Sequence, residues 1–135
     1  MKRRDKELLM TEALAAREKA VAPYSGFAVG AALLSVDGTI HRGANVESVS
    51  YGLTCCAERV ALFKALTEGQ RAFRAIAIVA RHDGGVMPYG ACRQLLFEYA
   101  PDARVLVADA AKPGSIREFK VANLLPGAFR EFTRG

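Results

Sequence analysis

Two uninterrupted apolar runs constrain the fold of this chain more than any other feature. Residues 27–35 read FAVGAALLS and residues 75–80 read AIAIVA, with no charged residue in either run. A strand that faces water on one side alternates apolar and polar residues, whereas an unbroken apolar run is typical of a strand buried on both faces. We therefore expect helices to cover both faces of a central sheet.

The rest of the chain supplies the elements that such a sheet needs. Helices are predicted over residues 5–20, 56–66 and 88–99, and further strands over 39–45, 104–108 and 116–121. Asp37-Gly38 is a hairpin signal between the first two strands, and the helix at 88–99 connects two strands as in a βαβ crossover. The order predicts an α/β fold, a three-layer α/β/α sandwich around a five-stranded mixed sheet. No linker, repeat or composition shift divides residues 1–135, so we expect one domain.

Composition excludes several classes of protein. Hydrophobic residues make up 51% and charged residues 24% of the chain, which excludes disorder. No apolar run approaches the roughly 18 residues of a membrane span, and the charged start MKRRDKELLM predicts no secretory signal. Three cysteines are too few for a disulfide framework, so we expect a cytoplasmic protein. The net charge of +5 comes from interleaved basic and acidic residues, so we do not expect a nucleic-acid partner.

Thiols at two predicted helix starts are the main candidates for chemistry. The P-loop, GxGxxG, GxSxG and HExxH signatures are all absent. Cys56 and Cys92 each lie near the start of a predicted helix, where the helix dipole favours the thiolate that binds metals. Glu58 follows Cys56 by two residues and could act on a metal-held water. Taken alone, the same pattern also fits cysteines that serve as small core residues.

Five segments in order across nearly the whole chain add a family resemblance. They are APYSGFAVGAALL, GANVES, CAERVALFKAL, YGACRQLLFEY and LLPGAF. Together they resemble the small, homotetrameric type of cytidine deaminase. CAE at 56–58 and PYGAC at 88–92 match the two halves of the zinc-deaminase signature. The resemblance implies a cytidine deaminase-like fold, one zinc ion per chain, hydrolytic deamination of cytidine and deoxycytidine, and a homotetramer with sites shared between subunits.

The resemblance also implies roles at the reaction centre. Cys56 and Cys92 would ligate zinc, and Glu58 would move protons between the attacking water and the pyrimidine ring. Arg59 and Gln94 match positions beside the thiolates. An arginine there would offset the negative charge that thiolates bring to a zinc centre.

Further positions match the family's nucleoside pocket. Asn45 and Glu47 would hold a sugar hydroxyl, since an amide and a carboxylate together donate and accept hydrogen bonds. Phe27 would form a wall of the base pocket, and the backbone of Ala57 would read the pyrimidine edge. Phe129, in LLPGAF, would stack on the base in a neighbouring subunit's site.

One residue departs from the family pattern. Tyr89 stands where the family has its second zinc cysteine, and a phenol is a harder ligand on a longer side chain than a thiol. Cys55, His82 and Asp83 are candidate replacements. The departure leaves open a zinc-deficient or catalytically altered nucleoside-binding member. A deaminase of blasticidin S, an aminopyrimidine nucleoside, is the nearest enzymatic alternative, and only the charge favours a nucleic-acid-binding protein on this scaffold.

Overall fold

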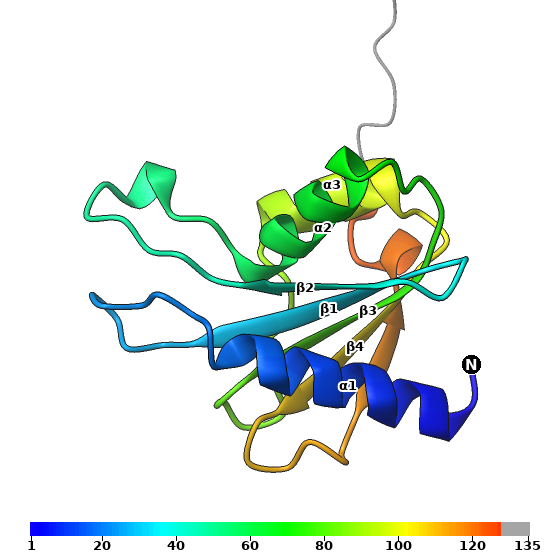
Figure 1. The fold of residues 1–135 in the computed structure, drawn as a ribbon, viewed down its shortest axis with the longest axis horizontal. Helices are drawn as coiled ribbons and strands as arrows, with labels where there is room; N and C mark the ends of the chain where they lie inside the picture. Colours follow the sequence, from blue (N-terminus) through cyan, green and yellow to red (C-terminus); the bar gives the residue numbers. More distant parts are fainter. Residues whose placement is uncertain (128–135) are drawn as a thin grey trace, which may run out of the picture.

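The computed structural model describes residues 1–127 and contains a five-stranded mixed sheet (Figure 1). Its order is β2-β1-β3-β4-β5, in which only β3 and β4 run parallel to each other. The strands are β1 (Val29–Ser35), β2 (Ile40–Ala44), β3 (Phe73–Ala80), β4 (Arg104–Asp109) and β5 (Arg117–Lys120). The predicted five-stranded mixed sheet is confirmed.

Helices cover both faces of the sheet, as the apolar runs require. Helix α1 (Arg3–Arg17) packs on one face, while α2 (Ala57–Thr67) and α3 (Gly90–Tyr99) pack on the other (Figure 1). Two short 3₁₀ helices, η1 (Tyr51–Leu53) and η2 (Val121–Asn123), lie in connecting segments. Within residues 1–127, no helix combines the length and apolar character that crossing a bilayer requires. The helices on the two faces of the sheet confirm the predicted three-layer α/β/α arrangement.

Two glycines let the helices approach the sheet closely. A Cβ on Gly30 would meet the backbone of Ala13 and Arg17 in α1, and a Cβ on Gly43 would meet the backbone of Ala57 and Ala61 in α2. Only glycine removes these contacts without moving a helix. The position of α2, and of the residues at its start, thus depends on the absence of a side chain at Gly43 in β2.

Element ends either match the predicted ends or differ from them by up to three residues. The first strand was predicted from Phe27, but pairing begins at Val29, opposite Ala80. The third helix was predicted from Pro88, but it begins at Gly90 with Tyr89 as its N-cap. These ends are set by pairing partners and backbone angles, which residue patterns do not specify.

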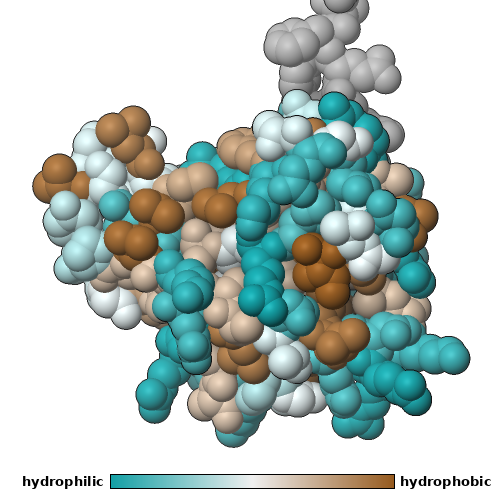
Figure 2. Space-filling model, in the orientation of Figure 1, coloured by the Kyte–Doolittle hydropathy of each residue, from teal (hydrophilic) through white to brown (hydrophobic). Residues whose placement is uncertain are grey.

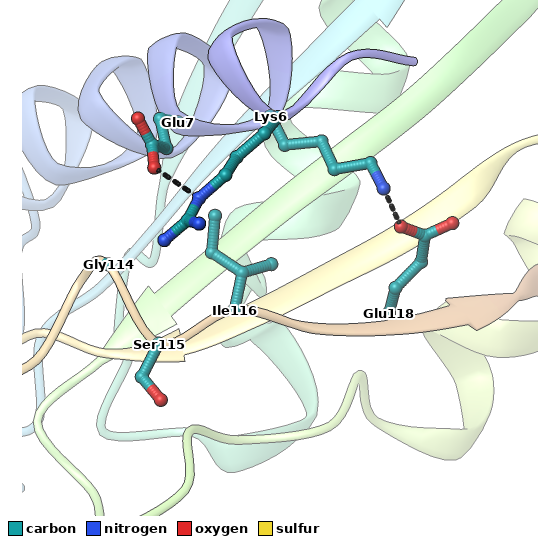
Figure 3. Close-up of a pocket in the computed structure, with 7 residues that line it drawn as sticks. Lys6, Glu7, Gly114, Ser115, Ile116 and Glu118 are labelled. Atoms are coloured by element: carbon teal, nitrogen blue, oxygen red, sulfur yellow. Dashed lines mark hydrogen bonds and ion pairs between the residues drawn. The ribbon is translucent and has the colours of Figure 1, made fainter.

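Ion pairs connect α1 to β5 on the face opposite α2 and α3. A hollow of about 470 Å³ lies there, lined by residues of both elements (Figure 3). Lys6 Nζ lies 2.5 Å from a carboxylate oxygen of Glu118, and this contact holds the pKa of Glu118 below its ordinary value. Arg3 and Glu7 form a second pair within α1 (Figure 3). The hollow contains partnered surface charges and no thiol or histidine, so it has none of the groups that the predicted chemistry requires.

Candidate active site

One end of the sheet brings together the residues singled out from the sequence. Strand β2 ends at Ala44 opposite Gly30, and Val29 at the start of β1 lies opposite Ala80 at the end of β3. The segment after β2 pairs with the segment that leads into α2, and the segment after β3 leads into α3. The N-termini of α2 and α3 therefore meet beside this end of the sheet.

A cluster of three donor side chains lies at these two helix starts. Cys56 is the N-cap of α2, Glu58 lies in the first turn of α2, and Cys92 lies in the first turn of α3. The two Sγ atoms and a carboxylate oxygen of Glu58 all lie within 4.8 Å of one another. Cys92 is buried, and Glu58 is only 5% exposed. The structure thus places these three predicted residues together.

The two thiols share a hydrogen bond that distinguishes their proton affinities. The Cys92 thiol donates to Cys56, which lowers the pKa of Cys56 to about 6 against the opposing effect of burial. The same hydrogen bond, together with burial, raises the pKa of Cys92. The contact therefore favours the ionised form of Cys56 over that of Cys92.

Glu58 is suited to holding a proton. Burial raises its pKa, and the negative charge of Cys56 adds to the effect, while backbone N–H groups of Glu58 and Tyr89 oppose it. A raised pKa favours the protonated carboxyl, the form that a group delivering a proton needs. The environment of Glu58 therefore fits a proton-transfer group.

Arg59 provides positive charge beside the thiolate. Its Nη2 lies 3.8 Å from Cys56 Sγ and donates to the carbonyl oxygen of Thr54 at 3.1 Å. Its Nε is buried without a hydrogen-bond partner. A buried N–H donor without a partner, on a cation beside a thiol, suits an anionic centre at this site. These contacts agree with the position beside the thiolates that the resemblance implies for Arg59.

The donor set is suited to the zinc ion that the resemblance implies. Thiolates and carboxylates both ligate zinc, with Zn–S near about 2.3 Å and Zn–O near about 2.0–2.2 Å. Cys56, Cys92 and Glu58 are close enough to contact one ion after small side-chain shifts. Tyr89 differs from them because its side chain is 67% exposed, although it lines the adjoining cavity.

A cavity of about 280 Å³ opens beside the donor cluster. Cys56, Ala57 and Glu58 line it at the start of α2, and Phe27 and Asn45 line it from the sheet end. Most of its remaining wall is apolar, which suits a flat aromatic base. The predicted pocket residues of this group thus face one cavity, and Phe27 precedes β1 instead of beginning it.

Asn45 holds the backbone at the mouth of this cavity. Its Oδ1 accepts a hydrogen bond from the Val29 N–H, and its Nδ2 donates to the Phe27 carbonyl, both at 2.9 Å. The side chain is 8% exposed. Besides the sugar contact that the resemblance implies, Asn45 therefore positions Phe27.

Glu47 lines a second hollow, of about 270 Å³. Its carboxylate accepts hydrogen bonds from the Tyr24 and Ser25 N–H groups at 3.1 Å, and Ser25 Oγ also donates to it. These hydrogen bonds, that of the Ser25 hydroxyl first, lower the pKa of Glu47. Thr54 lines both hollows, so Glu47 lies next to the cavity that holds Glu58.

The candidate replacement ligands do not join the donor cluster. Within residues 1–127, the group of close donors contains neither Cys55 nor His82 nor Asp83. Cys55 Sγ points to the Cys56 carbonyl at 3.8 Å, and burial raises its pKa. His82 and Asp83 are exposed in the loop after β3. The turn before α2 and the loop after β3 therefore add no third metal ligand to Cys56 and Cys92.

The predicted roles of two further residues, Gln94 and Phe129, stay predictions. Gln94 Nε2 donates to Glu98 Oε1 at 2.9 Å along α3, and its predicted place beside the thiolates stays a prediction. Phe129 lies outside the described residues, so its stacking role stays a prediction as well.

Several cavity residues were not singled out from the sequence. Ile78 of β3 and the Val86–Met87 pair before α3 line the apolar wall, and Thr54 connects the two hollows. Alternation along β3 could have assigned Ile78 to the face of α2 and α3. Val86 and Met87 precede Pro88 at a predicted helix start, but nothing in their pattern indicates which way they face.

Comparison with known proteins identifies the family. Residues 3–108 match the family model described as the cytidine and deoxycytidylate deaminase zinc-binding region. The chain belongs to this family. A cytidine deaminase of Halalkalibacterium halodurans is 54% identical over 126 residues, which span 93% of this chain and 94% of the relative. One from Sporosarcina psychrophila is 50% identical over 125 residues, 93% and 91% of the two chains.

Solved structures agree with the family assignment. The 1.6 Å crystal structure of cytidine deaminase from Burkholderia pseudomallei is 49% identical and superposes with a TM-score of 0.85. The match covers 90% of this chain and 97% of that one. The cytidine deaminase-like fold that the resemblance implied is thereby confirmed.

Proposed function

We propose that this protein catalyses hydrolytic deamination of cytidine and deoxycytidine, giving uridine or deoxyuridine and ammonia. One observation carries the proposal: Cys56 and Glu58 line an apolar cavity and lie within 4.8 Å of the buried Cys92, in a member of a zinc-binding deaminase family. Thiols and a buried carboxyl at the edge of a base-sized pocket are the equipment that the reaction needs.

The two adjoining hollows fit the two parts of a nucleoside. The base enters the cavity between Phe27 and the start of α2, with its amino-bearing carbon toward Glu58. The sugar then extends past Thr54 toward Glu47. Asn45 is placed between them and has hydrogen-bonding capacity for a sugar hydroxyl. Ala57, buried at the start of α2, presents its backbone to the pyrimidine edge.

Zinc held by Cys56 and Cys92 would supply a water whose pKa is lowered toward about 7. Glu58 accepts the proton of the attacking water and delivers it to the ring nitrogen of the base. It then passes a proton to the departing amine, which leaves as ammonia. Arg59 holds the thiolate of Cys56, and the apolar wall keeps bulk water from the reacting carbon.

Three alternative functions were considered from the sequence, and the observations support them unequally. Tyr89 favours a zinc-deficient protein that binds a nucleoside without converting it. Blasticidin S ranks behind cytidine as substrate, because relatives matching over nine-tenths of this chain are named cytidine deaminases. No described feature beyond net charge favours nucleic acid as a partner.

The proposal extends to the assembly. We propose a homotetramer in which Phe129 of one subunit stacks on the base bound by another subunit. We also propose that residues 1–135 form one domain. A cytoplasmic location agrees with the three free thiols, Cys55, Cys56 and Cys92. These statements rest on the resemblance and on the chemistry of the chain.

The test is an assay of the purified, zinc-supplemented protein with cytidine, followed by ultraviolet absorbance and by identification of uridine. We expect conversion, and we expect Glu58→Gln to lower kcat by about 10²–10⁴-fold, the contribution of a positioned proton-transfer group. Glu7→Gln, on the far side of the sheet, is the matched control. Retention of most activity in Glu58→Gln would refute the proton-transfer role. Nucleoside binding without uridine would establish the non-catalytic reading.

A further inference from the structure

The metal site of this chain has two nearby thiols where its family signature has three positions. Catalytic zinc sites use three protein ligands and keep a fourth position open. Tyr89 occupies the position of the missing thiol, so a third ligand must come from elsewhere in the chain. The question rests on the proposed function, which assigns zinc to this site.

The exposure of Tyr89 argues against its phenol as the third ligand. Its side chain is 67% exposed, while Glu58 and Cys92 are buried. A zinc-bound phenolate would have to turn into the cavity and lose contact with water. The Tyr89 carbonyl is also engaged, since it accepts the Arg93 N–H at 2.9 Å in the first turn of α3.

Glu58 meets the geometric requirement that Tyr89 does not. Two ligands of one tetrahedral zinc ion lie roughly 3.5–3.8 Å apart, from the usual Zn–S and Zn–O lengths. The Glu58 oxygen and the two Sγ atoms lie within 4.8 Å of one another, so contraction by about 1 Å would let all three contact one ion. Arg59 lies beside Cys56 and offsets the charge of an all-anionic donor set.

We propose that Glu58 is itself the third metal ligand in this chain, completing a site of two thiolates and one carboxylate. In three-thiolate members of the family the glutamate is free for proton transfer. Here the Glu58 carboxylate would serve both as a zinc ligand and as the proton-transfer group. It cannot do both at the same time. Zinc binding therefore competes with proton transfer, and deamination requires Glu58 to leave the metal.

The test is a mutational cycle read out by zinc affinity instead of activity. The variants are Glu58→Gln, Tyr89→Phe, Tyr89→Cys and the double variant Tyr89→Cys/Glu58→Gln. Each dissociation constant for Zn²⁺ is measured by competition with a chromogenic chelator, and thermal unfolding in the presence of a chelator checks folding. The amide of glutamine keeps the shape of the carboxylate and removes its charge.

The expected pattern is strongly non-additive. Glu58→Gln should weaken zinc binding by more than about 100-fold in the natural background, exceeding the cost of losing a group that merely supports a ligand. Tyr89→Phe should change it little. In the Tyr89→Cys background three thiolates hold the ion, so Glu58→Gln should then change zinc affinity less than about 3-fold, within the ordinary scatter of such effects.

Other outcomes would overturn the proposal. Unchanged zinc affinity in Glu58→Gln would exclude the carboxylate as a ligand, and a large loss in Tyr89→Phe would assign the third position to the phenol. Activity separates this inference from the proposed function. If the affinities follow the expected pattern but even Tyr89→Cys forms no uridine, the deaminase proposal fails and the ligand assignment stands. If Tyr89→Cys deaminates while the affinity pattern fails, the reverse holds.

Discussion

Asn45 forms hydrogen bonds to the backbone at the start of β1 and also lines the cavity beside Glu58. Its amide satisfies the Val29 N–H at the start of β1 and the Phe27 carbonyl just before it. Removing a buried partner leaves such groups unsatisfied, which costs more than the hydrogen bonds themselves contribute. The orientation of Phe27, and so the wall of the base pocket, depends on this residue.

We therefore predict that Asn45→Ala lowers the free energy of unfolding by about 1–3 kcal/mol. It should also raise the dissociation constant for cytidine, because the Phe27 segment loses its anchor. Urea unfolding and calorimetric titration measure the two effects. Asn123→Ala, at an exposed asparagine in η2, is the control and should change neither. A stable Asn45→Ala variant with normal affinity would contradict both roles.

At the residue scale, closeness in space was predictable where closeness in sequence implied it. Cys56 and Glu58 are two residues apart at one helix start, so their proximity was predictable. Cys92 joined them only through a second helix, and its contact with Cys56 depends on how α3 docks. The exposure of Tyr89 could not be predicted, because an aromatic residue at a helix start fits either direction.

At the scale of elements, the α2–β2 contact sets the position of the donor cluster. Gly43 lies against the backbone of Ala57 and Ala61, at the helix end that carries Cys56 and Glu58. Backbone atoms cannot yield as a flexible side chain can, so any side chain at this position must push α2 outward.

Gly43→Ala should lower the free energy of unfolding by about 1–3 kcal/mol, the usual cost of overpacking. It should also weaken zinc binding, because the start of α2 moves relative to Cys92. Thermal unfolding and chelator competition measure these effects. Gly114→Ala is the matched control, since a Cβ there meets nothing within 4 Å. Equal behaviour of the two variants would show that α2 is not held at Gly43.

The order and type of the elements were predictable, because apolar runs and helical spacing are local properties. Several of the element ends could not be predicted in this way. Strand β3 starts at Phe73, before the predicted Ala75, because Phe73 pairs with Ser35 across a register shift. Pairing between distant strands thus extended an element beyond its own pattern.

At the scale of the whole molecule, an exposed apolar segment is the surface at which we expect the proposed subunits to meet. Residues 46–53 project from one end of the sheet, and Figure 2 shows hydrophobic side chains gathered there. Val49, Tyr51 and Leu53 are each at least 75% exposed. Clustered exposed apolar residues are typical of an interaction surface. The hollow lined by Glu47 adjoins this segment, which agrees with sites shared between subunits.

We predict that the natural protein sediments as a tetramer and that Val49→Ser/Leu53→Ser shifts it to smaller species. Polar side chains there would remove the apolar area that association buries. Analytical ultracentrifugation measures the masses. Leu8→Ser, at an isolated exposed leucine of α1, should leave the assembly unchanged. A natural protein that sediments as a monomer would refute the homotetramer.

The sequence by itself determined the layered fold and the family, because apolar runs and collinear motifs are local properties that survive without coordinates. It also identified the donor residues and the departure at Tyr89. Only the tertiary structure decided which donors meet. Cys55 neighbours Cys56 in sequence yet points to a backbone carbonyl, while Glu58 joins Cys92 across two helices. The physical reason is that a metal site depends on directions in space, which helix starts and sheet packing set together.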